Sequence, residues 1–169
     1  MTTTRIDRGS TDTTTIYSEG GDLHYERTFD APRELVWKAH TDPELVSKWW
    51  GPLRHQTRVE EMDLRPGGTW RYVSVDGEGN EFAFYGEYLE IVPPEMIRWT
   101  FMFDVEGVGP QGGPETLTLE DLGDGRTKMR AVGHMGSEEV IEAALGTGMT
   151  QGAIETWDRL DTLLAELAD

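Results

Sequence analysis

The 169-residue chain contains no cysteine. That absence excludes disulfide bonds, thiolate metal ligands and a catalytic thiol, and it fits a reducing compartment. Basic residues are also scarce, because 15 lysines and arginines stand against 32 aspartates and glutamates, which gives a formal charge of −17. A field of this sign repels phosphate backbones, so the composition argues against a nucleic-acid partner.

Long hydrophobic runs are missing as well. No stretch approaches the roughly 20 apolar residues of a membrane span. The residues that follow Met1 lack the apolar core of a signal peptide. We therefore expect a cytoplasmic protein without a membrane span.

Cofactor and metal motifs are absent or unsupported. The stretch 107–112 matches GxGxxG, but it contains Pro110 and leads into a predicted strand, whereas a dinucleotide fingerprint opens a helix. His24, His40 and His55 are scattered and show no ligand spacing. We therefore predict no cofactor and no metal site.

The first 18 residues are polar and rich in threonine, and they show no hydrophobic periodicity. Such a segment buries too little apolar surface to offset the entropy lost on ordering. We expect a flexible polar tail over residues 1–18 and a single domain over residues 19–169.

Alternating apolar and polar residues predict a strand over residues 23–29, followed by two short helices that begin near Pro32 and Thr41. The Gly51-Pro52 pair ends the second helix. Six further strands with short turns are typical of an antiparallel meander. They are predicted over residues 57–64, 69–75, 81–92, 96–105, 116–121 and 127–134. The stretch 107–113 is interpreted as a flexible loop.

The segment 137–167 carries an apolar residue every three or four positions, which predicts one long amphipathic helix. Glycines weaken its middle, so we expect a kink or a break near Gly146–Gly148. The economical packing is an α+β fold in which a seven-stranded curved antiparallel sheet wraps around this C-terminal helix.

Successive side chains of a strand point to opposite faces of the sheet, and this alternation (parity) predicts many aromatic residues on the concave face. Two interpretations stay open: ordinary core, or core for most of the length with some residues lining a cavity at one end. Gly148 and Gly152 of the helix would leave space opposite the sheet. The predicted ligand-binding residues are Trp50, Trp70, Tyr72, Phe82, Phe84, Trp99, Phe101, Phe103, Met149 and Trp157.

Adjacent tryptophans, Trp49 and Trp50, end the second short helix. Adjacent helical residues lie about 100° apart, so both cannot share one face. Since Trp49 follows Leu45 by four positions, we expect Trp49 in the core and Trp50 at the cavity rim.

Two further residues are candidates for polar contacts. Arg27 shares parity with the inward residues of its strand, so it either binds an anionic ligand or pairs with a local carboxylate. His134 closes the last strand and faces outward by strict parity, unless a bulge or the strand end turns it inward. No catalytic residue is identified.

Four stretches carry a family resemblance: RTFDAPRELVWKAHTDPELVSKWWGP, RPGGTWRY, GEYLEIVPPEMIRWTF and GMTQGAIETWDRLDTLLAEL. Over residues 21–168 the chain resembles the family named after the activator of the heat-shock chaperone ATPase. That family belongs to the helix-grip superfamily, with START lipid-transfer domains, birch-pollen-allergen-like proteins and polyketide cyclases. The resemblance implies a seven-stranded sheet that grips the C-terminal helix, with a hydrophobic cavity between them.

Three functions are therefore considered. The first is binding of a small hydrophobic molecule, either a lipid or an aromatic, polyketide-like compound. The second is a cyclase or hydratase acting in the same cavity, with Arg27, His134 and Tyr72 as candidate polar groups. The third is regulation of a chaperone ATPase, with the chaperone as partner. Edge strands and exposed aromatic residues also suggest a homodimer.

Overall fold

The computed structural model describes residues 4–105, 107 and 109–168. In this part of the chain, nine strands form one sheet and four helices pack on it. The elements are β1 (Ile6–Asp7), β2 (Thr14–Glu19), β3 (Asp22–Phe29), α1 (Arg33–Thr41), α2 (Pro43–Trp49), β4 (Gln56–Met62), β5 (Thr69–Val75), β6 (Glu81–Val92), β7 (Met96–Val105), β8 (Gly109–Gly123), β9 (Arg126–His134), α3 (Glu138–Leu145) and α4 (Met149–Leu167).

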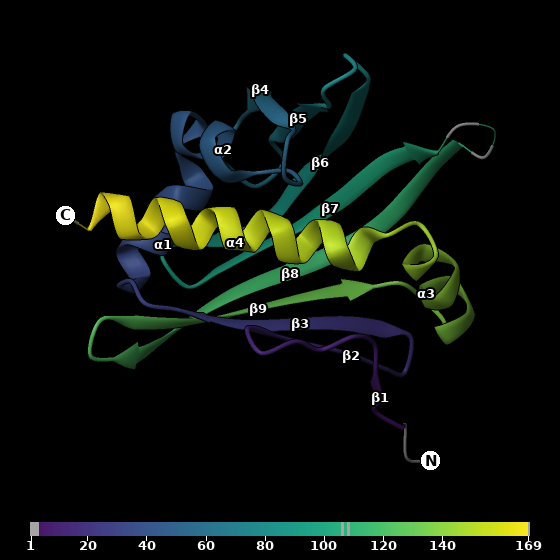
Figure 1. Cartoon of the computed structure of the whole chain (residues 1–169), viewed down its shortest axis with the longest axis horizontal. Helices are drawn as coiled ribbons and strands as arrows, with labels where there is room; N and C mark the ends of the chain where they lie inside the picture. The colour runs from purple at the N-terminus through teal and green to yellow at the C-terminus, as the bar shows by residue number, and fades with distance from the viewer. Residues whose placement is uncertain (1–3, 106, 108, 169) are drawn as a thin grey trace.

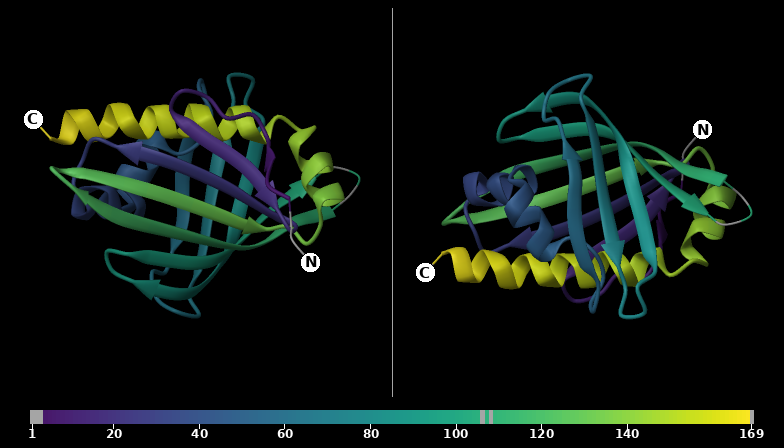
Figure 2. Two further views of the ribbon diagram at one scale, coloured as in Figure 1. Left: turned by 90° about the horizontal axis from the view of Figure 1, so that it is seen from below. Right: turned by 90° about the horizontal axis from the view of Figure 1, so that it is seen from above.

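The sheet is antiparallel throughout, in the order β1-β2-β3-β9-β8-β7-β6-β5-β4. The predicted meander from β4 to β9 is confirmed. α4 lies across the concave side of the sheet, with α1 and α2 near its C-terminal half and α3 beyond its N-terminus (Figure 1). Strands β3 and β9 run nearly along α4, whereas β4–β6 cross it steeply (Figure 2). This bend makes the sheet concave toward the helix.

The prediction of seven strands is wrong, because β1 and β2 extend the sheet beyond β3. Both strands lie in the threonine-rich segment that was expected to be a loose tail. Thr14, Ile16 and Ser18 alternate inward and are at most 1% exposed. Two of the three are hydroxyl residues, so hydrophobic periodicity does not reveal the strand. Their β-branched neighbours nevertheless suit a pleated backbone.

Helices α1 and α2 meet at a proline. The Asp42 side chain caps α2 by accepting a hydrogen bond from the Glu44 amide at 3.0 Å. Pro43 has no N–H for the Ala39 carbonyl, and the Trp49 indole donates to that oxygen instead, at 2.9 Å. Trp49 is 2% exposed, whereas Trp50 is half-buried. Trp49 therefore lies in the core, as predicted, whereas a place for Trp50 at the rim of a cavity stays a prediction.

The expected single C-terminal helix is two helices, α3 and α4, and the break lies at Gly146–Gly148 as predicted. Ser137 caps α3 by accepting from the Val140 amide. Gly148, with φ of 84°, begins α4 in a left-handed conformation that suits glycine. Among the helices of residues 4–105, 107 and 109–168, none combines the length and apolar character that crossing a membrane requires.

The expected loop over residues 107–113 is mostly strand, because β8 begins at Gly109 and pairs with β7 over residues 109–118. A Cβ at Gly112 would lie 2.0 Å from the Phe101 carbonyl oxygen, so only glycine permits this pairing. Pro114 is tolerated because the pairing of β9 with β8 stops at Glu115–Gly133. Residues 109–113 of the predicted loop are therefore an extension of the sheet.

Candidate functional site

An aromatic cluster covers the concave face of the sheet where β5, β6 and β7 lie side by side. Trp70, Tyr72 and Trp99 are buried there, with 1%, 1% and 6% of their surface exposed. The ring centre of Trp70 lies 4.8 Å from that of Tyr72 and 5.1 Å from that of Trp99. Phe84 and Phe101 pack against this group and are half-buried. Strand alternation thus places these five predicted residues together.

Trp50 closes one side of the aromatic cluster. Its ring centre lies 5.3 Å from Tyr72 and 4.8 Å from Phe84, and both contacts are edge-on. Phe101 lies 6.3 Å from Trp50. Phe103 is half-buried and prolongs the row, 6.3 Å from Phe84. The cluster therefore extends from the core to a partly exposed rim.

The loop that follows Trp50 is tied to α4 by polar contacts. The Arg159 guanidinium donates to the carbonyl oxygens of Gly51 at 2.9 Å and Pro52 at 3.1 Å. The Glu155 carboxylate accepts from the Leu53 amide at 3.1 Å. Arg159 also reaches the carbonyl oxygen of Lys48, at the end of α2. The rim is thus fixed to the helix through its backbone, while the Trp50 side chain faces the cluster.

Phe82 is not covered as the prediction of a wall residue requires, because 45% of its surface is exposed. It is the second residue of β6, next to the hairpin turn, where the strand has passed beyond the aromatic cluster. Its ring lies 5.7 Å from that of His55. Parity predicts the side of the strand on which Phe82 lies, but not the end of the covered surface.

Met149 and Trp157 pack against a second hydrophobic cluster, which is formed by β2, β3, β8, β9 and the helices. Trp157 contacts the ring of Tyr25 edge-on at 5.2 Å. Both α4 residues are half-buried. The structure therefore divides the predicted wall into two groups, and Trp50 packs against both.

A carboxyl group lies between these two clusters, and the sequence analysis missed it. Glu115 is on β8, opposite Trp99 of β7 and Gly133 of β9. It shares the inward face with Leu117 and Leu119, which are 4% and 3% exposed. The Glu115 side chain is half-buried by surface exposure, but its carboxyl is surrounded by protein atoms. Desolvation raises the pKa of this carboxyl from 4.5 to about 7, and a contact with the Trp99 indole opposes the shift. Parity with Leu117 and Leu119 is the sequence signal that could have identified it.

Three buried polar atoms around Glu115 have no hydrogen-bond partner among the described residues. They are Trp99 Nε1, Tyr25 Oη and Thr150 Oγ1. Burial, and then the Glu115 charge, raise the pKa of the Tyr25 phenol, while Thr150 opposes that rise. The Glu115 charge acts on Tyr25, and weak hydrogen-bonding contacts join Trp99 to Glu115 and Thr150 to Tyr25, so these four side chains are neighbours. Neither contact has the geometry of an ordinary hydrogen bond, so the polar atoms stay unsatisfied. Buried polar atoms without partners are uncommon in folded proteins, so this group is a candidate recognition site.

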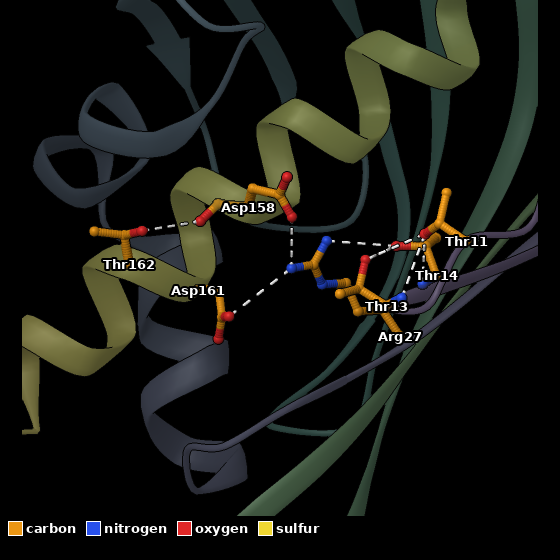
Figure 3. A network of polar contacts seen from close by, with 7 residues as sticks. All are labelled: Thr11, Thr13, Thr14, Arg27, Asp158, Asp161 and Thr162. Atoms are coloured by element: carbon orange, nitrogen blue, oxygen red, sulfur yellow. Dashed lines mark hydrogen bonds and ion pairs between the residues drawn. The ribbon is translucent and has the colours of Figure 1, made fainter.

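Arg27 lies away from the aromatic cluster and is 4% exposed. Its guanidinium lies 5.5 Å from the ring centre of Phe29, a residue of the second hydrophobic cluster. Figure 3 shows its guanidinium between α4 and the threonine segment that leads into β2. It forms ion pairs with Asp158 at 2.8 Å and Asp161 at 3.9 Å, and it donates to Thr14 at 3.4 Å. Of the two alternatives for Arg27, the structure has the local carboxylate pair.

His134 lies on the outer side of the sheet end, where its Nδ1 atom contacts the Asp22 carboxylate at 3.0 Å. It is exposed, as strict parity predicts. The structure brings neither His134 nor Arg27 to the aromatic cluster.

Two surface hollows lie away from the aromatic cluster. One, of about 440 Å³, is lined by the threonine segment, Arg27 and Lys128. The other, of about 660 Å³, lies at the C-terminal end of α4. No aromatic residue lines either hollow. Within the described part of the chain, no three histidine, aspartate or glutamate side chains are grouped to hold a metal ion.

Solved structures share this fold. A crystal structure from Mycobacterium smegmatis is 29% identical, with a TM-score of 0.77 over 88% of this chain and 93% of that one. A solution structure from Arthrobacter aurescens is 26% identical, with a TM-score of 0.78 over 87% of each chain. A crystal structure from Rhodobacter sphaeroides, 24% identical, supports the fold alone, with a TM-score of 0.81 over 92% and 99%. The search of curated proteins found no match.

The family model described as "Activator of Hsp90 ATPase homolog 1-like protein" matches residues 30–165. The matched range contains the aromatic cluster, Glu115 and most of α4. It covers well over half of the chain, and the architecture agrees with the resemblance found in the sequence. The chain therefore belongs to the family of Activator of Hsp90 ATPase homolog 1-like proteins.

Proposed function

We propose that the protein binds a small hydrophobic or aromatic molecule between the concave face of the sheet and α4. The observation that carries this proposal is the row of aromatic rings from buried Trp70, through Phe101 and Phe84, to Phe103, the last three of which are half-buried. A row that reaches from core to solvent gives an apolar molecule a continuous surface for entry. Membership of a helix-grip family supports a ligand in this region without naming one.

Trp50 is the side chain that an entering molecule would move. Its backbone carbonyl accepts hydrogen bonds from Thr57 and Arg159, so the main chain stays anchored while the side chain rotates. Each edge-on ring contact contributes roughly 0.5–1.5 kcal/mol beyond its buried area. A ligand ring can replace such contacts, after which Trp50 closes over it. The proposed wall consists of Trp50, Trp70, Tyr72, Phe82, Phe84, Trp99, Phe101, Phe103, Met149 and Trp157.

A ligand screen tests this function. Native mass spectrometry and tryptophan quenching, with lipids and aromatic polyketide-like compounds, should find at least one ligand that binds with saturation. Trp50→Ala is expected to weaken that ligand about tenfold in calorimetric titration, because an aromatic contact is lost.

The matched control is Tyr85→Ala. Tyr85 neighbours Phe84 in β6 but faces outward, where it donates to Asp104 at 2.7 Å. This variant should bind like the unmodified protein. The proposal would be contradicted if no compound in the screen bound with saturation. It would also be contradicted if Trp50→Ala and Tyr85→Ala weakened the affinity equally.

The two alternative functions, a cyclase or hydratase and a regulator of a chaperone ATPase, are hypotheses. A cyclase or hydratase acting beside the aromatic cluster would not have Arg27 or His134 as polar groups. Arg27 pairs with Asp158 and His134 with Asp22, both away from that cluster. Glu115 is the acid that such an enzyme would use instead.

Regulation of a chaperone ATPase is tested by pull-down and by stimulation of the ATPase. A homodimer is tested by sedimentation.

A further inference from the structure

Glu115 lies at the seam between the two hydrophobic clusters. β8 separates β9 from β7 in the sheet, so the row Gly133, Glu115, Trp99 leads from one cluster to the other. Directly opposed residues of antiparallel strands have Cβ atoms about 4.5–5.5 Å apart. The inward face of β8 thus changes from Leu117 and Leu119 to a carboxyl group where the two clusters meet.

Glycine leaves one flank of this carboxyl open. Gly133, opposite Glu115 on β9, shares the inward face and carries no side chain. A Cβ built there would meet only Met135 Sδ, at 3.7 Å, which is an ordinary contact. A larger residue would therefore fit at this position, and the glycine places no side chain beside Glu115. Thr150 approaches the same region from the first turn of α4.

The unpartnered atoms define the chemistry of a complementary group. Trp99 Nε1 can only donate, and the hydroxyls of Tyr25 and Thr150 can donate or accept. Trp99 and Tyr25 are 6% and 7% exposed, so water competes little for them. An ammonium group would pair with Glu115 but leave the Trp99 donor unmet. A ligand carboxylate would lie next to the Glu115 carboxyl, and two acidic groups at one site repel each other when charged. A neutral hydroxyl oxygen can accept from Trp99 and donate to Glu115.

We propose that Glu115, Trp99, Tyr25 and Thr150 form a polar subsite that recognises a neutral hydroxyl group on an aromatic ring, of the phenol or enol class. The subsite rests on the proposed function, because the aromatic wall holds the body of the same ligand. The ligand oxygen accepts from Trp99 Nε1 and donates to the Glu115 carboxyl. Tyr25 and Thr150 lie beside this pair, able to contact a second ligand oxygen.

Calorimetric titration with 2-naphthol and naphthalene separates the subsite from the wall. The two probes share a ring system and differ by one hydroxyl. We expect 2-naphthol to bind about tenfold more tightly or better, because hydrogen bonds to a charged group are the stronger ones. In Glu115→Met and Trp99→Phe this preference should fall below about threefold. Naphthalene affinity should be little changed in Glu115→Met, because Glu115 is not part of the aromatic wall.

Glu120→Met is the matched control, because it removes an exposed carboxylate from the outer face of the same strand. It should keep the preference for 2-naphthol. Equal affinities of the unmodified protein for both probes would overturn the subsite but leave the wall supported. Binding of neither probe would contradict the wall, and the subsite with it. Retention of the preference in both variants would also overturn the subsite.

Discussion

Glu115→Gln is expected to stabilise the protein by roughly 3 kcal/mol at about pH 8 and to have no effect below about pH 4.5. The pKa of Glu115 rises from 4.5 to about 7 on folding, chiefly through burial. Between these values the folded protein holds a proton that the unfolded chain has lost, so stability falls as pH rises. Glutamine has no charge to bury. Urea unfolding at several pH values measures the difference.

His40 provides an opposite slope in the same experiment. It is 7% exposed, and burial lowers its pKa from 6.5 to about 4, partly offset by its contact with the Val36 carbonyl at 2.8 Å. The unfolded chain binds the proton first, so stability falls as pH drops from about 6.5 to 4. His40→Phe should remove that acid-side loss, and Glu115→Gln the loss on the alkaline side. A Glu115→Gln effect independent of pH would contradict the buried-acid assignment.

Trp49→Ala is expected to cost roughly 3–5 kcal/mol of unfolding free energy, as large-to-small core changes do. The variant also removes the donor that satisfies the Ala39 carbonyl above Pro43. Trp50→Ala should cost less than half as much, because Trp50 is half-buried and leaves no backbone group unpaired. Trp49→Phe, which keeps a ring but not the N–H, should fall between the two. Denaturant unfolding measures all three.

Equal destabilisation by Trp49→Ala and Trp50→Ala would refute the division of roles. In that case Trp50 would be a core residue like its neighbour. The proposed movement of its side chain over a ligand would then lose its basis.

Much of the scaffold follows from local rules. The 100° step of a helix separates Trp49 from Trp50, and glycines at 146 and 148 break the C-terminal helix. The period of two in a strand brings Trp70 and Tyr72 of β5 onto one face, and Trp99 and Phe101 of β7 likewise. These rules depend only on near neighbours in the chain, which a sequence displays directly.

Other features depend on pairing between distant segments. The burial of Thr14 and Ser18 requires β3 beside them, and the strand form of residues 109–113 requires β7. Glu115 is not among the residues predicted for the site. Its acidic side chain suggests a solvent-exposed position, whereas its alternation with Leu117 indicates the interior. The end of the covered surface at Phe82 is likewise a property of the assembled sheet.

Indole N–H resonances during a titration with 2-naphthol give the most direct test of a ligand site that joins the aromatic wall to Glu115. The six tryptophans report separately on core, rim and subsite. Binding as proposed shifts the Trp50 and Trp99 signals with saturation and leaves that of Trp49, hydrogen-bonded to Ala39, unchanged. Saturable shifts that spare Trp50 and Trp99, or the absence of any saturable shift, would contradict it.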